Sequence, residues 1–222
     1  MVKPTHSFSC SLCGASHKKW TGRCDACGEW NSVQEQEPLA AGPGTKTLGA
    51  TKGCKITLSD LQTEDKPLLR AKCGMDELDR VLGGGLVPAS AILVGGDPGI
   101  GKSTLLLQAA AKFALAGKKA IYVSGEEAAS QIRMRAQRLD LSHSPVQVAS
   151  ESNLRDILTT LDTERPDLVV IDSIQTMWIE HIDSAPGSVS QVRAVAHELT
   201  TFAKRKGIAV ILVGHVTKEG QI

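Results

Sequence analysis

A glycine-rich segment in the middle of the chain carries the clearest chemistry in the sequence. Residues 96–103 read Gly-Asp-Pro-Gly-Ile-Gly-Lys-Ser and fit the pattern G-x-x-x-x-G-K-[ST]. Backbone N–H groups of such a loop wrap around phosphates, and glycine allows the close approach. We expect the Lys102 side chain to reach the β- and γ-phosphates, and the Ser103 hydroxyl to ligate Mg²⁺. A glycine-rich turn without a ligand is the alternative. The predicted nucleotide-binding residues are Gly95, Gly96, Asp97, Pro98, Gly99, Ile100, Gly101, Lys102, Ser103 and Thr104.

Polar side chains follow three aliphatic stretches and could complete a site for Mg²⁺ and ATP. Asp172 follows the run 168–171 in the form of a Walker B strand, which predicts a carboxylate on the metal side. Glu126 and Glu127 follow a second run, and one of them is a candidate general base that orients the attacking water. The alternative is that both favour the start of the next helix through its dipole, which fits Glu127 better. His215 follows the third run, where it could sense the γ-phosphate or be structural.

Four cysteines near the N-terminus have the spacing of a metal shell. Two CxxC pairs lie ten residues apart, and each pair can place both sulfurs on one tetrahedral ion. The predicted ligands of this structural zinc are Cys10, Cys13, Cys24 and Cys27. Iron–sulfur or redox use is the alternative. His6 and His17 could replace a ligand, but we expect them at the surface because four paired cysteines are present. Cys54 and Cys73 have no CxxC partner and are expected to be ordinary thiols.

Short aliphatic runs alternate with helical stretches over most of the chain. Continuous aliphatic runs indicate strands buried on both faces, and the alternation predicts an α/β fold, a parallel sheet with helices on both faces. The expected strands are 91–94, 120–123, 146–148, 168–171 and 208–213, and the expected helices are 103–115, 128–139, 154–161 and 191–206. Within 128–139, Ile132, Ala136 and Leu139 share one face, so we expect Arg133, Arg135 and Arg138 largely on the other.

Composition divides the chain and excludes several protein classes. The 222 residues are 41% hydrophobic and carry a net charge of +1, which excludes disorder and a globally basic nucleic-acid binder. We predict a zinc module over 1–33, a linker over 34–56, and the α/β domain from 57 to 222. The N-terminus lacks a secretory pattern, and the apolar run Ile208–Val213 is too short to span a membrane. We therefore expect a soluble, cytoplasmic protein in which cysteines bind metal rather than form disulfides.

Taken together, these motifs resemble the ATPase core of the RecA-like superfamily. The matching stretches are 78–86, 95–104, 123–127 and 170–173. This core, combined with the cysteine module that includes residues 20–32, is similar to a family of bacterial DNA repair ATPases. The resemblance implies that Glu126 activates water and that His215 couples the nucleotide state to DNA-binding loops. It also places the first such loop at Met177–Ser188 and the start of the second near Lys218.

The resemblance also implies what the protein does and what it binds. Members of the family form homo-hexameric rings, hydrolyse ATP with Mg²⁺, bind single-stranded DNA and branch-migrate recombination intermediates alongside the RecA recombinase. The chain ends at Ile222, inside the expected second loop. We therefore expect a fragment or a truncated product whose core is incomplete at its C-terminal end. One alternative is a nucleotide-gated adaptor whose zinc module binds a protein. Another is a different RecA-like helicase or motor, which the zinc module disfavours.

Overall fold

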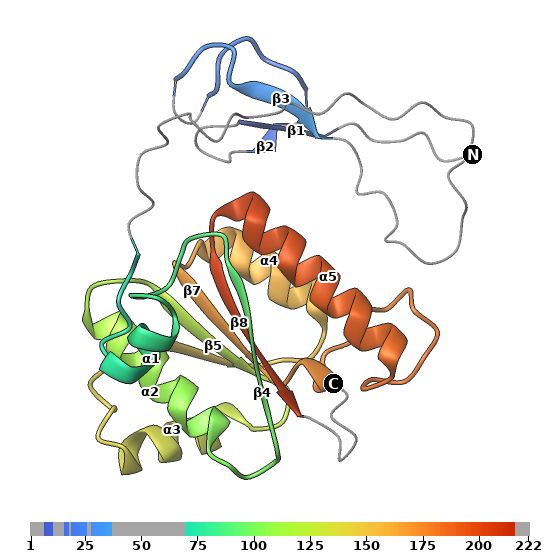
Figure 1. The fold of residues 1–222 in the computed structure, drawn as a ribbon. Coiled ribbons are helices and arrows are strands. Elements are labelled where there is room, and N and C mark those ends of the chain that lie inside the picture. Colours follow the sequence, from blue (N-terminus) through green and yellow to red (C-terminus); the bar gives the residue numbers. More distant parts are fainter. Residues whose placement is uncertain (1–6, 11–15, 18, 26–27, 37–69, 216–222) are drawn as a thin grey trace. The chain divides into compact units, whose positions relative to one another are not determined.

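The computed structural model describes residues 7–10, 16–17, 19–25, 28–36 and 70–215, which form two compact units (Figure 1). The division falls between Thr57 and Leu58. Each unit has its own buried apolar core. The predicted linker 34–56 lies outside the described residues from position 37 onward.

The N-terminal unit is a small antiparallel sheet of order β2-β1-β3. Its strands are β1 (Ser7–Cys10), β2 (Ser16–His17) and β3 (Val33–Gln36). Strand β3 begins at Val33, the last residue of the predicted zinc module, and extends to Gln36. It pairs with the whole of β1, from Cys10 opposite Val33 to Ser7 opposite Gln36. Among the described residues, Cys10, Cys24 and Val33 form its buried apolar cluster.

The larger unit contains a five-stranded, fully parallel sheet of order β4-β8-β7-β5-β6. This arrangement confirms the predicted α/β class. The strands are β4 (Ala91–Gly96), β5 (Ala120–Ser124), β6 (Gln147–Ser150), β7 (Leu168–Asp172) and β8 (Ala209–His215). The helices are α1 (Asp76–Val81), α2 (Lys102–Leu115), α3 (Ala129–Arg138), α4 (Leu154–Glu164), the 3-10 turn η1 (Ile174–Thr176) and α5 (Val189–Lys206).

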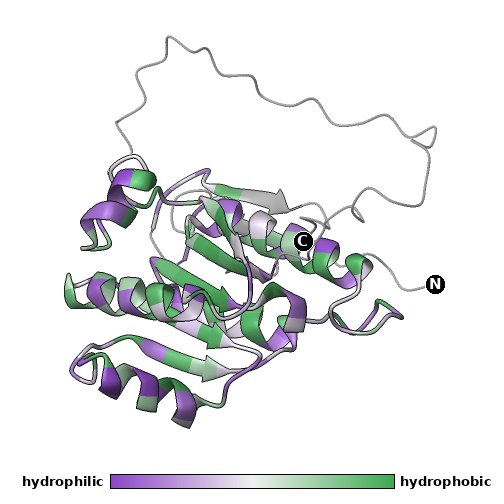
Figure 2. Cartoon of the chain, turned by 60° about the horizontal axis from the view of Figure 1, so that its bottom comes forward, coloured by the Kyte–Doolittle hydropathy of each residue, from purple (hydrophilic) through white to green (hydrophobic). Residues whose placement is uncertain are grey.

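Helices cover both faces of this sheet, with α2 and α3 on one face and α4 and α5 on the other (Figure 1). Strand residues alternate between the two faces, as the pleat requires. In β7, Val169 and Ile171 belong to the cluster under α4 and α5, whereas Leu168 and Val170 belong to the cluster under α2. Figure 2 shows hydrophobic strands between helices of mixed hydropathy. Two buried faces explain why the strands read as continuous aliphatic runs.

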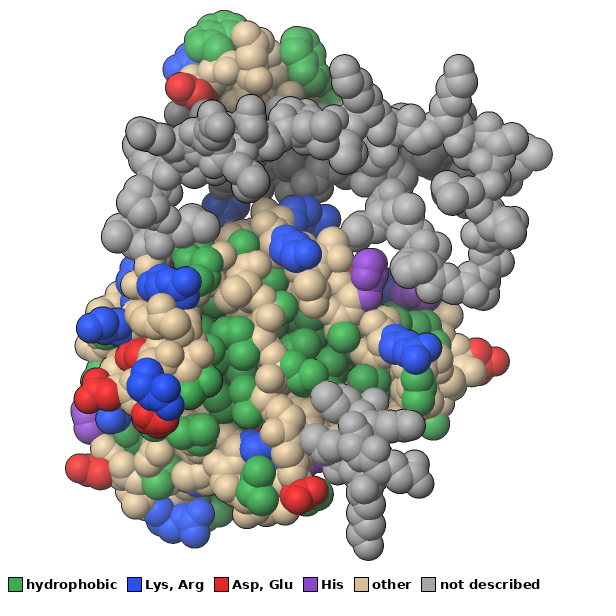
Figure 3. Space-filling view, in the orientation of Figure 1, with side chains coloured by type: hydrophobic (Ala, Val, Ile, Leu, Met, Phe, Trp, Pro, Cys, Tyr) green, Lys and Arg blue, Asp and Glu red, His purple; other side chains and the backbone are tan. Residues whose placement is uncertain are grey.

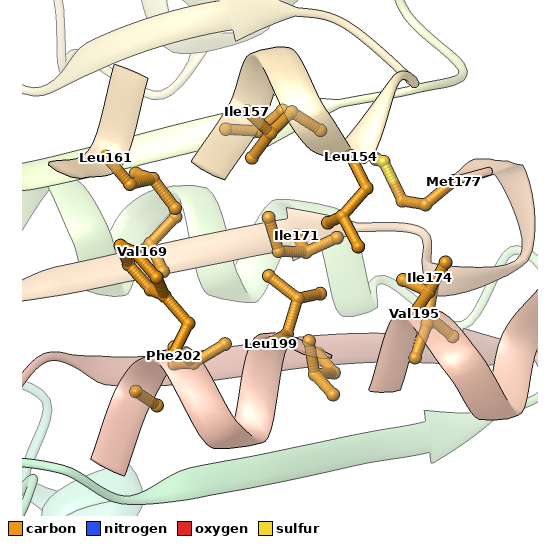
Figure 4. Packing of buried hydrophobic residues seen from close by; sticks show 14 of the residues in the cluster. Leu154, Ile157, Leu161, Val169, Ile171, Ile174, Met177, Val195, Leu199 and Phe202 are labelled. Atoms are coloured by element: carbon orange, nitrogen blue, oxygen red, sulfur yellow. The ribbon is translucent and has the colours of Figure 1, made fainter. Parts of the chain in front are cut away.

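The face under α4 and α5 is closed by interlocking aliphatic side chains (Figure 4). Leu161 from α4 and Leu199 from α5 lie with Ile171 of β7 in this cluster, and each is at most 1% exposed. Such packing stabilises a domain chiefly through removal of apolar surface from water. It holds the central strands and their carboxyl ends in place.

Strand β4 forms one edge of the described sheet and is covered less completely. Leu93 is 49% exposed, whereas the middle strands β5 and β7 are buried along their whole length. Figure 3 shows hydrophobic side chains gathered on the face where β4 lies in front in Figure 1. None of the helices in the described part of the chain is both long and apolar enough to cross a bilayer.

Several features differ from those predicted from the sequence, and the bounds of most elements shift by one to three residues. The helix α1 and the turn η1 were not predicted, because each is too short to show a helical period. Strand β8 extends to His215 and β4 to Gly96, so both run further than expected. The prediction that Arg135 lies on the outer face of α3 is wrong: Arg135 is 7% exposed, because it follows Ile132 by three residues and shares its face.

Candidate active site

The glycine-rich segment joins the edge strand β4 to helix α2. Gly101 is the residue before the helix and has φ +97°, a left-handed conformation that favours glycine. The Lys102 ammonium donates hydrogen bonds to the carbonyl oxygens of Gly96 (2.7 Å) and Asp97 (2.8 Å). Lys102 is only 7% exposed. The loop therefore holds a buried cation at the positive end of a helix, a combination suited to phosphate groups.

The strand register brings the other predicted site residues to the same edge of the sheet. Gly96 pairs with His215 across β4 and β8, and Ser124 pairs with Asp172 across β5 and β7. Glu126 follows two residues after the end of β5. The phosphate loop, the Walker B carboxylate and the candidate base thus meet at the carboxyl ends of parallel strands, where open α/β sheets bind ligands.

Glu126 is held by two side chains, that of Ser173 directly after β7 and that of His215 at the end of β8. The Ser173 hydroxyl donates a hydrogen bond to Glu126 Oε1 (2.6 Å), and His215 Nε2 lies 3.2 Å from the same oxygen. Burial alone would raise the pKa of Glu126, but the hydrogen bonds from Ser173 and His215 and the charges of His215 and Lys102 outweigh it and hold the pKa below its usual value. Glu126 is therefore an ionised carboxylate at this edge of the sheet, as a water-orienting base must be.

Glu127 has a different environment, although it follows directly in the chain. Its carboxylate forms an ion pair with the buried guanidinium of Arg135 in α3. The Ser124 hydroxyl accepts the backbone N–H groups of both Glu126 (3.2 Å) and Glu127 (3.0 Å), which fixes the turn between β5 and α3. The two glutamates therefore point to different partners, and only Glu126 contacts His215 and Ser173.

Asp172 ends β7 and is 4% exposed. The hydroxyl of Tyr122 donates a hydrogen bond to Asp172 Oδ2, and it also lies 3.5 Å from the Ser103 carbonyl oxygen. Burial raises the pKa of Tyr122 far above its usual value, the Asp172 carboxylate raises it further, and Arg135 opposes both effects. Tyr122 therefore remains a protonated donor. A carboxylate and the Ser103 hydroxyl are hard oxygen ligands of the kind that Mg²⁺ prefers, so these residues fit the predicted metal.

Sequence reasoning missed Ser173, Tyr122 and Arg135. Ser173 directly follows Asp172, so its position at the site edge was readable, but its bond to Glu126 depends on how β5 and β7 pair. Gly125 shows the same dependence, since a Cβ there would lie 2.2 Å from the Thr176 hydroxyl oxygen. The turn after β7 therefore packs closely against the turn after β5, and this contact fixes the site.

The N-terminal unit contains two of the four predicted zinc ligands within the described residues. Cys10 and Cys24 are both buried, at 2% and 1% exposure, whereas Cys13 and Cys27 lie outside the described residues. His17, expected at the surface, has a side chain only 9% exposed, and its Nε2 lies 3.4 Å from Cys24 Sγ. Two buried sulfurs in so small a core are soft donors that fit a zinc site.

An aromatic pair is exposed on the same unit. Trp20 is 61% exposed and Trp30 is 69% exposed. The Arg23 guanidinium lies 5.8 Å from the centre of the Trp30 ring and donates a hydrogen bond to the Gly28 carbonyl oxygen (2.7 Å). Exposed tryptophans beside an arginine are typical of surfaces that bind partners.

The segment 177–188, which matches the first predicted DNA-binding loop, is held in shape by one buried side chain. The Gln191 amide accepts the Ile179 N–H (2.9 Å) and donates to the carbonyl oxygens of Ile182 (3.1 Å) and Ser184 (3.0 Å). A pocket of about 480 Å³ lies along this loop, between Trp178 and Gln191. The loop contains Glu180 and Asp183 but no lysine or arginine, so it carries little positive charge of its own.

Comparisons with known proteins match two parts of the chain to two different families. A family described as AAA domain matches residues 58–221, and one described as rubredoxin metal binding domain matches residues 8–35. The chain is 51% identical to the DNA repair protein RadA of Brucella abortus over 230 residues, which covers 100% of this chain and 49% of that protein. It is 47% identical to RadA of Listeria monocytogenes (100% of this chain, 48% of the relative) and 46% identical to RadA of Escherichia coli (99% and 48%). The chain spans about half the length of these curated relatives.

Proposed function

The chain belongs to the AAA domain family, and within it to the RadA family of DNA repair proteins, and from this premise we propose that it hydrolyses ATP in recombinational DNA repair. One observation carries the proposal. Lys102, Asp172 and an ionised Glu126 meet at one edge of the parallel sheet. A cation for the phosphates, a metal-side carboxylate and a general base are the parts that phosphoryl transfer to water needs.

The chain's own residues would divide the reaction as follows. The loop residues 95–104 and the Lys102 ammonium would bind and orient the phosphates. Ser103 and Asp172 would hold Mg²⁺, which neutralises phosphate charge when bound. Glu126 would orient the attacking water and accept its proton, since its low pKa keeps it ionised. His215, 3.2 Å from Glu126, would report the γ-phosphate to residues that follow β8.

Replacement of Glu126 by glutamine tests the catalytic assignment. Glu126→Gln should lower the ATP hydrolysis rate about 10²- to 10⁴-fold, the usual contribution of general base catalysis, while ATP binding persists. Glu77→Gln is the matched control, because the Glu77 side chain is 77% exposed and contacts only Arg80 among the ion pairs of the described residues. Unchanged turnover in Glu126→Gln would refute the role of Glu126.

The DNA-related part of the proposal is supported by the relatives, which are named DNA repair proteins, and by the resemblance of the motifs to the family of bacterial DNA repair ATPases. We propose that hydrolysis is stimulated by single-stranded DNA, and that the whole protein acts as a cytoplasmic homo-hexamer on recombination intermediates together with the RecA recombinase. Because residues 177–188 contain no lysine or arginine, Lys218 of the second predicted loop, which lies outside the described residues, would supply positive charge for the DNA backbone. Hydrolysis measured with and without single-stranded DNA tests this step, and equal rates would contradict it.

A nucleotide-gated adaptor is the second candidate, and the exposed Trp20 and Trp30 favour it. Tryptophan and arginine are enriched at the centres of protein interfaces. In this case the metal-binding unit would capture a protein partner and hydrolysis would only time the release. Nucleotide-dependent capture of a partner in the absence of DNA, with no stimulation of hydrolysis by DNA, would support the adaptor over the motor.

A further inference from the structure

Two polar contacts border the apolar cluster under α2 and α3. The Glu127 carboxylate forms an ion pair with the Arg135 guanidinium, and the Tyr122 hydroxyl donates a hydrogen bond to Asp172 Oδ2. The cluster contains fully buried side chains such as Leu106 and Ile132. Polar groups in such a place cost free energy unless they are paired, so their arrangement calls for an explanation.

Tyr122 lies beside the candidate nucleotide site. It is fully buried in β5, and its hydroxyl lies between two elements of the nucleotide site, the Ser103 carbonyl oxygen in the first turn of α2 and Asp172 Oδ2 at the end of β7. A carboxylate can rotate about its side-chain bonds, and a fixed donor on one oxygen restricts that rotation. A donor on Oδ2 also leaves the second carboxylate oxygen available for a metal ion.

Arg135 of α3 forms an ion pair with Glu127, and its side chain is only 9% exposed. By contrast, Arg133 and Arg138 of the same helix are exposed. The charge of Arg135 lowers the pKa of Tyr122, against the larger effects of burial and Asp172. The hydrogen bond that fixes the Asp172 carboxylate comes from Tyr122.

We propose that Tyr122 is a positioning residue for the magnesium-side carboxylate, and that its hydroxyl holds Asp172 in the rotamer that binds Mg²⁺. This inference rests on the proposed function, because it deepens the assignment of Asp172. A packing role alone would require only the ring of Tyr122, whereas positioning requires the hydroxyl.

The test is the Mg²⁺ dependence of nucleotide binding by the full chain, measured with a fluorescent non-hydrolysable ATP analogue. Tyr122→Phe keeps the ring and removes the donor. The Mg²⁺ concentration for half-maximal binding should rise about tenfold, the scale of one hydrogen bond to a charged group, while binding at saturating Mg²⁺ stays near wild type. An unchanged Mg²⁺ midpoint, with or without a lower thermal midpoint, would overturn the inference.

Arg138→Met, a change on the exposed side of α3, is the control for these measurements and should leave the Mg²⁺ midpoint at its wild-type value.

A spectroscopic readout separates positioning from packing, because Tyr122 is the single tyrosine in the chain. With ¹³Cζ-labelled tyrosine, one resonance reports its hydroxyl. Addition of Mg²⁺ to the nucleotide-bound protein should shift this resonance in wild type, and Asp172→Asn should abolish the shift. If wild type binds the nucleotide but its tyrosine resonance does not shift, the inference is overturned while the proposed function stands. If wild type binds no nucleotide at any Mg²⁺ concentration, the proposed function is overturned as well.

Discussion

The buried apolar cluster described in the N-terminal unit consists of Cys10, Cys24 and Val33, whereas the larger unit has one aliphatic cluster on each face of its sheet. Two of the three side chains in the small cluster carry sulfur. In the larger unit, the cluster that contains Leu199 consists of aliphatic side chains with Phe202 and Met177, and it includes no cysteine. A unit with so little apolar area to bury needs a cross-link or a metal to fold, and one with two closed faces does not. The comparison predicts that the two units fail under different treatments.

Metal removal should produce the largest difference between the units. Chelation, or replacement of the buried Cys24 by serine, should unfold the N-terminal unit completely, since ligand binding and folding are coupled in small zinc domains. Helical circular dichroism from the larger unit should persist, while the fluorescence of Trp20 and Trp30 changes. Cys73→Ser is the control, because Cys73 belongs to the larger unit and has no CxxC partner. Loss of the helical signal on chelation would contradict the independence of the units.

A cavity in the larger unit should have the opposite effect. Leu199→Ala should lower its free energy of unfolding by about 2–5 kcal/mol, since Leu199 is completely buried between α5 and the sheet. Zinc content and the tryptophan signal of the N-terminal unit should not change. The matched control is Val189→Ala at the start of the same helix, where 59% exposure predicts a change within about 0.5 kcal/mol. Equal thermal shifts for both variants would contradict the packing described under α5.

The smallest effect concerns a cysteine that stabilises the larger unit as a thiol. Cys73 Sγ donates a hydrogen bond to Asp79 Oδ1 (2.9 Å), and burial, followed by this bond, raises the pKa of Cys73 from 9.0 to about 11. Because the folded-state pKa is above the unfolded one, the stabilisation is complete below pH 9 and is lost as pH rises toward 11, up to about 2 kcal/mol.

Urea unfolding of wild type and Cys73→Ser between pH 8 and 11 measures this contribution. Serine does not titrate in that range, so the variant should lack the extra alkaline decline. Parallel pH profiles for the two proteins would show that the thiol contributes nothing. The same residue type thus serves the two units in different ways, as a predicted metal ligand in one and as a buried hydrogen-bond donor in the other.

What the sequence could predict depends on how local the signal is. The phosphate loop, the aliphatic run before Asp172 and the CxxC spacing are contiguous patterns, and the family comparisons and the parallel sheet agree with the α/β core and the metal-binding unit that they predicted. The fold class followed because continuous aliphatic runs fit strands buried on both sides. The short helix α1 was missed because six residues cannot display a helical period.

The contacts inside the site could not be read from the sequence. The bond between Ser173 and Glu126 joins residues 47 positions apart, and that between Tyr122 and Asp172 joins residues 50 apart. Both depend on the pairing of β5 with β7, which no local sequence pattern predicts. The burial of Arg135 was available in principle from its spacing to Ile132, but an arginine is expected to face solvent unless a partner such as Glu127 is known.

Equilibrium binding of ATP in the presence of Mg²⁺ tests whether the larger unit holds an ATP site built on the loop around Lys102. Wild type should bind, and Lys102→Ala should lose measurable affinity because the buried ammonium supplies the positive charge for the phosphates. Lys118→Ala, an exposed lysine after α2, is the control and should bind as wild type does. Affinity near wild type in Lys102→Ala would contradict the account.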